Sequence, residues 1–173
     1  MVIKVNIIKG VLFLLIFLSS TYIGILISSK YKNRVNDLNE FKRTLNVIKT
    51  KIRYTYEPIG DICEEIAQIN STRIGKLFEE VKNLLKTKPI TEAWDIAIDT
   101  YGNNFSKEDK KLIKSFGKML GKTDKEGQVS QILELQEFLS LQIDKAEMER
   151  QKNEKLYKSL GMVIGIAIII ILI

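Results

Sequence analysis

The side chains that most often carry catalysis and metal binding are sparse in this sequence. It contains no histidine and a single cysteine, Cys63. Histidine is the commonest general acid–base group and the commonest protein metal ligand, so its absence removes both roles at once. A lone cysteine forms no internal disulfide, and without a histidine nearby Cys63 lacks the base that would activate its thiol. Its apolar neighbours Ile62 and Ile66 predict a small core side chain.

The acidic and aromatic residues are spaced as on helix faces. Apolar stripes contain the aromatic side chains of Phe78, Trp94, Tyr101, Phe105 and Phe116, which predicts core positions for them rather than a ligand cage. The carboxylate pairs Glu64/Glu65 and Glu79/Glu80 lie in amphipathic patterns, which are typical of solvated surfaces rather than of acid–base dyads. No G-x-x-x-x-G-K-[ST] loop, G-x-S-x-G elbow, C-x-x-C pair or H-E-x-x-H motif occurs. A hydrolase or transferase would need a nucleophile and a base that the sequence does not supply. We therefore expect no enzyme activity, no cofactor and no metal.

The net charge of +6 raises the question of nucleic-acid binding. Along the predicted helices, however, bases alternate with acids, as in Lys107-Glu108-Asp109-Lys110-Lys111. Such alternation is typical of a solvated helix face. The unbalanced bases lie beside two uncharged segments, where membrane topology accounts for them. We expect neither nucleic acid nor a small-molecule substrate as a partner.

Two uncharged segments have the composition of membrane helices. Residues 10–29 provide 20 uncharged positions, about 30 Å of helix, which is one hydrocarbon thickness. A cleaved signal peptide is the alternative, and the bases that begin at Lys30 argue against it. Residues 159–173 provide 15 uncharged positions, a marginal span of about 22 Å that Lys155 and Lys158 can extend by snorkelling. The alternative for this segment is a buried core helix.

Basic residues flank the two segments asymmetrically. The outer flank of the first segment carries only Lys4 and Lys9. The inner flanks carry Lys30, Lys32, Arg34, Lys42 and Arg43 after the first segment, and Lys145, Arg150, Lys152, Lys155 and Lys158 before the second. The positive-inside rule then predicts a cell-membrane protein that crosses the bilayer twice. Residues 1–9 form a short extracytoplasmic tail, and residues 30–158 form a cytoplasmic domain.

Small residues recur at four-residue spacing in both apolar segments: Ser20, Gly24 and Ser28 in the first, Gly161 and Gly165 in the second. This spacing lets helix backbones approach closely in a bilayer. It predicts helix packing in the membrane, without distinguishing contacts within one chain from self-association.

The central region shows helical periodicity and no convincing strand pattern. A first apolar stripe contains Leu38, Phe41, Leu45, Ile48 and Ile52. Pro58 ends that helix after Tyr56 and opens the next, about Ile59–Ile69. Ser71 caps a third helix, and Pro89 separates it from a fourth that carries Trp94 and ends at Gly102.

Two further helices complete the central region. Ser106-Lys-Glu-Asp109 has the form of a capping box and opens a helix that Gly121 closes. Thr123-Asp-Lys-Glu126 then caps a last helix, which either runs unbroken into the second apolar segment or has a joint near Asn153. The predicted fold is all-α: a compact cytoplasmic bundle of about five to six helices, flanked by N- and C-terminal transmembrane helices.

Three elements of the sequence together resemble one known family. They are the run Phe116–Asp124 (FGKMLGKTD) followed by Gln128, the run Lys155–Gly161 (KLYKSLG), and the segment Ile52–Ile66 with its Tyr-x-x-x-Pro-Ile turn. Their combination resembles the stage III sporulation protein AB family of endospore-forming bacteria, over nearly the whole chain. That family is itself similar to the F-type inner-membrane platform domain of type II secretion and type IV pilus systems.

The resemblance implies a place in a complex between mother cell and forespore, on the mother-cell side of the outer forespore membrane. It also implies other stage III sporulation proteins as partners, with a secretion-type ATPase among them. Secretion platforms usually carry two such helical domains and this chain has one, so a platform here would need self-association or partners. We expect a non-enzymatic membrane scaffold. The alternative is a membrane-anchored regulatory or sensor module, which would need a pocket with converging polar groups.

Two junctions between helices are the best candidates for partner binding, because loops placed by a rigid bundle commonly carry it. The alternative is that both are only helix junctions, since their residues also have the chemistry of helix ends. The two junctions are the stretches Tyr54–Pro58 and Leu120–Gln128. Within them the candidate residues are Tyr54, Tyr56 and Pro58 in the first, and Leu120, Gly121, Asp124 and Gln128 in the second.

The predicted orientation can be tested by cysteine accessibility. In Lys88→Cys and Val2→Cys variants, an impermeant thiol reagent applied to intact cells should label position 2 and leave position 88 unlabelled until the cells are opened. Labelling of position 88 from outside intact cells would contradict a cytoplasmic domain.

Overall fold

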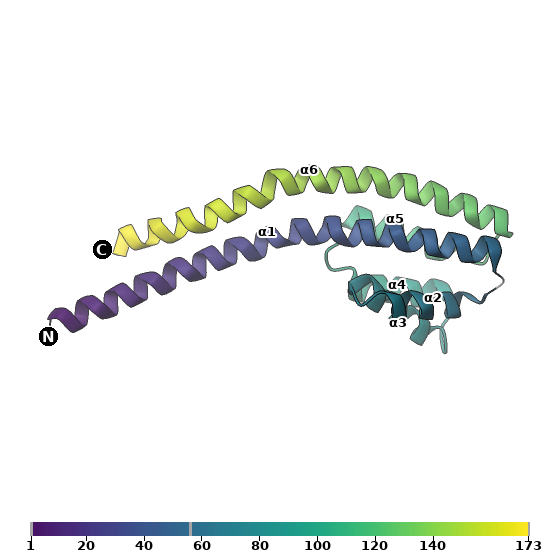
Figure 1. Cartoon of the computed structure of the whole chain (residues 1–173), viewed down its shortest axis with the longest axis horizontal. Coiled ribbons are helices and arrows are strands. Elements are labelled where there is room, and N and C mark those ends of the chain that lie inside the picture. Colours follow the sequence, from purple (N-terminus) through teal and green to yellow (C-terminus); the bar gives the residue numbers. More distant parts are fainter. Residues whose placement is uncertain (1, 56, 173) are drawn as a thin grey trace. The chain divides into compact units, whose positions relative to one another are not determined.

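The computed structural model describes residues 2–55 and 57–172, and that part of the chain contains six α-helices and no strand. This confirms the predicted all-α class. The helices, labelled in Figure 1, are α1 (Val2–Tyr54), α2 (Ile59–Ile69), α3 (Arg73–Leu84), α4 (Ile90–Tyr101), α5 (Lys107–Met119) and α6 (Lys125–Leu172).

Most helix ends follow the predicted chemistry. The capping box at Ser106 is confirmed: its Oγ accepts the Asp109 N–H at 3.1 Å, and its N–H donates to Asp109 Oδ2 at 2.8 Å. Two predicted ends are wrong. α1 ends at Tyr54 rather than after Tyr56, and α3 is capped by Thr72, whose hydroxyl accepts the Gly75 N–H, rather than by Ser71.

The chain divides into two compact units, each described by itself. Residues up to Asn33 and those from Ala146 onward form the terminal unit, and Arg34–Lys145 form the central unit. The central unit lies inside the predicted 30–158 range. α6 is helical through Asn153, without a break.

Two helices are long and apolar enough to cross a membrane, within Lys9–Tyr54 and Lys125–Leu172. Their apolar side chains are largely exposed, as at Leu14 (58%) and Ile171 (82%). Exposed apolar side chains of this density fit a lipid environment and argue against the alternative of a buried core helix.

The core of the central unit is built from one face of each helix. In sequence order α2 packs on α3, α3 on α4 and α4 on α5. The buried stripe of α1 faces inward, as predicted, except that Ile52 is only half-buried. The largest fully buried side chains are Leu38, Phe41, Leu45, Ile48, Ile62, Ile74, Leu77, Phe78, Trp94, Ile98, Ile113 and Phe116.

Trp94 lies at the centre of an aromatic cluster, which confirms its predicted core position. Its ring is 5.5 Å from that of Phe78, 5.6 Å from Phe116 and 6.2 Å from Phe41, in tilted or edge-on arrangements. Each such pair contributes about 0.5–1.5 kcal/mol beyond its buried area. The indole N–H donates to the Ile113 carbonyl at 2.9 Å, so no polar group is left unpaired on this side chain.

Gly117 lets α5 approach the indole closely. A Cβ at this position would lie 2.2 Å from Cδ1 of Trp94, well inside van der Waals contact. The glycine therefore fixes how near α5 lies to α4.

Candidate docking site

The structure brings the two predicted junctions together around one groove of the central unit, about 350 Å³ in volume. The residues before α2 and the turn between α5 and α6 both contribute to its wall. We call it the docking groove; it is lined by Ile52, Thr55, Glu57, Ile59, Ile62, Ile90, Leu120, Gly121, Lys125 and Gln128.

The docking groove has an apolar floor and a polar rim. Ile62 and Leu120 are buried, and Ile59 is half-buried. On the rim Glu57 is exposed and accepts from Lys51 Nζ at 3.2 Å. Hydrogen bonds to Glu65 and Glu57 raise the pKa of Lys51, so this base stays charged. Such a groove suits one or two apolar side chains of a partner, surrounded by polar contacts.

The predicted docking residues divide into three groups. Leu120, Gly121 and Gln128 line the groove, whereas Tyr54, Pro58 and Asp124 do not. Tyr54 is 73% exposed at the end of α1, and Pro58 is the N-cap of α2. Tyr56 lies outside the described residues. Thr55, Glu57 and Lys125 also line the groove and lie within the two predicted stretches. The sequence reasoning missed the apolar side chains Ile52, Ile59, Ile62 and Ile90, which join the site through the packing of separate helices.

The turn between α5 and α6 is held by its own side chains. Asp124 Oδ1 accepts the Gly127 N–H at 2.9 Å and caps α6, so the predicted cap at Thr123 is wrong by one residue. The Gln128 amide donates to the Thr123 carbonyl at 3.0 Å and accepts the Gly121 N–H at 3.5 Å. Gly121 has φ +73°, a conformation that favours glycine. These bonds assign Asp124 and Gln128 to shaping the turn.

Cys63 is the sole thiol of the sequence, and the structure places it in the core. Burial raises the pKa of this thiol to about 12, which keeps it protonated and poorly nucleophilic at neutral pH. Among residues 2–55 and 57–172, no group of three or more Cys, Asp or Glu side chains is arranged to hold a metal ion.

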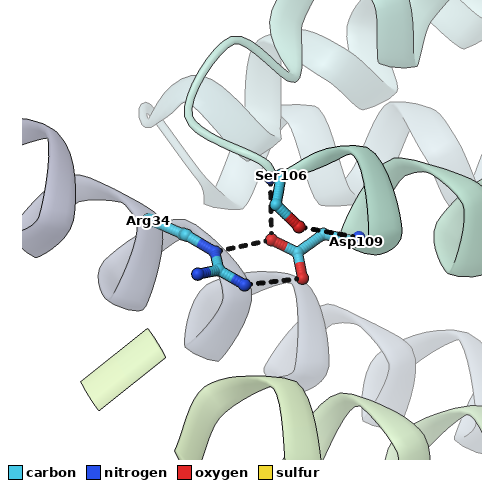
Figure 2. A network of polar contacts seen from close by, with 3 residues as sticks. All are labelled: Arg34, Ser106 and Asp109. Carbon is cyan, nitrogen blue, oxygen red and sulfur yellow. Dashed lines mark hydrogen bonds and ion pairs between the residues drawn. The ribbon is translucent and has the colours of Figure 1, made fainter. Parts of the chain in front are cut away.

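A buried ion pair joins α1 to the first turn of α5 (Figure 2). Arg34 Nε lies 2.7 Å from Asp109 Oδ2, and a second guanidinium nitrogen lies 3.1 Å from Oδ1. The Asp109 side chain is fully buried, and its carboxylate also accepts the Ser106 N–H of the capping box. The sequence predicted the box but assigned Arg34 to the membrane flank, because a base beside an apolar segment carries no sign of a distant partner.

A second buried acid, Asp37, lies on α1 one turn after Arg34. The Asp37 carboxylate accepts from Asn104 Nδ2 at 2.7 Å and lies 3.6 Å from Arg73 Nε. Burial raises the pKa of Asp37, and the contacts with Asn104 and Arg73 partly oppose that rise. Polar contacts therefore tie α1 both to α3 and to the segment before α5.

A second and larger groove, about 760 Å³, lies between α1 and the α2–α3 junction and was not predicted. Its lining is rich in amides, with Asn36, Asn39 and Asn70. Two of these amides are engaged within the chain: Asn39 donates to the Val35 carbonyl, and Asn70 accepts from Thr72. Internal pairing of this kind favours a structural groove over a sensor pocket.

In the terminal unit, four of the five predicted small residues, Ser20, Gly24, Gly161 and Gly165, lie at close contacts between α1 and α6. Ser20 Oγ donates to the Gly161 carbonyl at 2.7 Å. A Cβ at Gly24 would lie 3.0 Å from Gly161 Cα, and one at Gly165 would lie 3.3 Å from Phe17 Cα. Ser28, in contrast, donates to the Ile25 carbonyl of its own helix. The stacked rings of Tyr31 and Tyr157, 5.9 Å apart, also join the two helices in this unit.

Comparisons with known proteins give one consistent result. A family model for stage III sporulation protein AB matches residues 9–173. Stage III sporulation protein AB of Bacillus subtilis (strain 168) is 25% identical over 161 residues, which cover 91% of this chain and 94% of that protein. A solved structure of stage III sporulation protein AB covers 69% of this chain and 98% of its own, with a TM-score of 0.63 at 20% identity. The last likeness shows a shared fold.

Substitutions in the α5–α6 turn test the assigned cap. Asp124→Ala should lower the free energy of unfolding by about 1 kcal/mol, because it removes the acceptor for the Gly127 N–H. Thr123→Ala should cost less than half as much, because the carbonyl that Gln128 uses remains. Both values can be measured by denaturant titration of the full chain in detergent, followed by the fluorescence of Trp94.

If Thr123→Ala lowered the free energy of unfolding as much as Asp124→Ala or more, Thr123 would be the N-cap of α6. Unchanged stability in Asp124→Ala, together with loss of a partner in cells, would make Asp124 a contact residue instead.

Proposed function

The chain belongs to the stage III sporulation protein AB family, and on that premise we propose that it is a non-enzymatic membrane scaffold of a sporulation-specific, secretion-like complex between mother cell and forespore. Its relatives are named as sporulation proteins. Within the complex, the scaffold docks a secretion-type ATPase or other stage III components. The family's similarity to F-type secretion platforms supports this partner class.

The docking groove is the observation that carries the proposal. It presents apolar side chains such as Ile59 and Ile90 beside the charged groups of Glu57 and Lys125. An apolar centre with a polar rim is the usual anatomy of a protein-binding surface. The side chains that shape the groove come from segments packed on the buried core of the central unit, where Ile62 and Leu120 are themselves buried.

The membrane placement is part of the same proposal. Residues 10–29 and 159–173 cross the bilayer, and residues 30–158 face the mother-cell cytoplasm. The remaining flanking bases support this orientation, although Arg34 is engaged by Asp109 and no longer counts toward it. The close approach at Gly24 and Gly161 supports packing of the two spans within one chain and leaves their outer faces to lipid or to a second copy.

A charge-reversed groove tests the proposal in sporulating cells. The double variant Glu57→Arg/Ile90→Gln places an opposite charge and an amide at the groove, without touching the fully buried core. Co-purification with the secretion-type ATPase should weaken by about thirtyfold or more, because loss of a central interface contact costs about 2 kcal/mol. The number of heat-resistant spores should fall with it.

The matched control is Glu79→Arg/Leu141→Gln, a change of the same chemistry at two exposed positions outside the groove. Both proteins should remain in the membrane fraction with a buried Trp94. Normal spore numbers and undiminished co-purification in the groove variant would refute the proposal.

A further inference from the structure

α5 and the turn that follows it carry six lysines, and the structure separates them into two groups. Lys110 and Lys114 lie against Asp99, at 4.0 and 2.7 Å. The remaining lysines are exposed and form no ion pair within residues 2–55 and 57–172. These are Lys107, Lys111, Lys118 and Lys122, which we call the basic stripe.

The basic stripe is a continuous feature of one helix face. At 100° per residue, Lys107, Lys111 and Lys118 fall within about 40° of one another on α5. They span about 16 Å at the standard rise. Lys122 follows in the turn, immediately after Gly121 of the docking groove.

The acids that alternate with these lysines in the sequence do not neutralise them on the surface. Asp109 is buried against Arg34 and Ser106. The pKa of Glu108 is lowered by a hydrogen bond at its own backbone, by one to Ser106, and by the charge of Lys145 on α6. At 100° per residue Glu108 lies about 60° or more around α5 from the three stripe lysines of that helix, and no ion pair joins it to them within residues 2–55 and 57–172. Acids and bases alternate along this part of the sequence, but the exposed face of α5 that carries the basic stripe has a net positive charge.

We propose that the basic stripe binds an acidic segment of the partner protein, and that an apolar residue at the end of that segment enters the docking groove. The inference rests on the proposed function and names the chemistry of the docked segment. The charge of the stripe calls for carboxylates over about 16 Å, which is about eleven residues of helix or about five of extended chain. Lys122 directly follows Gly121 of the apolar groove. This adjacency favours a polypeptide, because one chain segment can present a row of carboxylates and an apolar side chain together.

Peptide binding by the full chain in phosphatidylcholine nanodiscs tests this inference. The probe is a fluorescent oligoglutamate peptide of about eleven residues that ends in two leucines, matched in length to the stripe. The variant Lys107→Gln/Lys111→Gln/Lys118→Gln should bind it about tenfold more weakly, because three charge contacts are lost. The difference should shrink at about 1 M salt, where the Debye length is about 3 Å.

The control Arg43→Gln/Lys76→Gln/Lys86→Gln removes the same charge from three exposed positions outside α5 and should change the affinity by less than about twofold. Equal affinity of the stripe variant and the unmodified chain would overturn the inference. The inference would also be overturned if the stripe variant kept its affinity for the peptide but bound phosphatidylglycerol vesicles or a single-stranded RNA more weakly. That result would assign the stripe to a membrane or to nucleic acid.

The two proposals fail separately. The groove variant Glu57→Arg/Ile90→Gln should lose the extra affinity that the terminal leucines add over plain oligoglutamate. If the stripe variant keeps full peptide affinity while the groove variant still loses its partner in cells, the scaffold function stands and the acidic segment does not.

Discussion

The buried ion pair between Arg34 and Asp109 is the constraint on which the central unit depends. Two charges removed from water must satisfy each other, because an uncompensated buried charge costs several kcal/mol. Here the guanidinium contacts both carboxylate oxygens, and the carboxylate also closes the capping box of Ser106 (Figure 2). One interaction thus fixes the start of α5 against α1 and ends the preceding loop in a defined geometry.

The position of α5 determines most of what the surface presents. In its last turn, Gly117 admits the indole of Trp94, so the helix is held close to α4. At its end, Gly121 turns the chain toward α6 and lines the docking groove. On its outer face lie the lysines of the basic stripe. The scaffold proposed here would act through the relative placement of its binding surfaces, and these contacts of α5 set that placement.

Local sequence signals predicted the local structure well. Pro58 and Pro89 preceded helices where the sequence indicated, and the Ser106 box was read correctly, because these features depend on a few adjacent residues. The cap of α6 was placed at Thr123 because Thr and Asp both cap helices, and the chain offers them side by side. The structure identifies Asp124 as the cap, because its side chain accepts the Gly127 N–H in the first turn of α6.

Tertiary features escaped the sequence for a different reason. Contacts between distant segments bury Arg34 against Asp109 and place Glu57 and Lys125 at one groove. Such contacts also decide which of the α5 lysines have an acidic partner. Alternating charge described the composition of α5 correctly but not its surface, because Asp109 faces inward. The family resemblance supplied the biological setting, which no single side chain encodes.

A double-mutant cycle on the ion pair tests this account most directly. By denaturant titration of the full chain in detergent, followed by Trp94 fluorescence, Arg34→Met should cost about 3–5 kcal/mol, because it leaves a buried carboxylate unpaired. Arg34→Met/Asp109→Asn removes both charges but keeps an oxygen for the Ser106 N–H, and should recover at least half of that loss. A cost below about 1 kcal/mol for the single variant, or no recovery in the double variant, would contradict the central role of the pair.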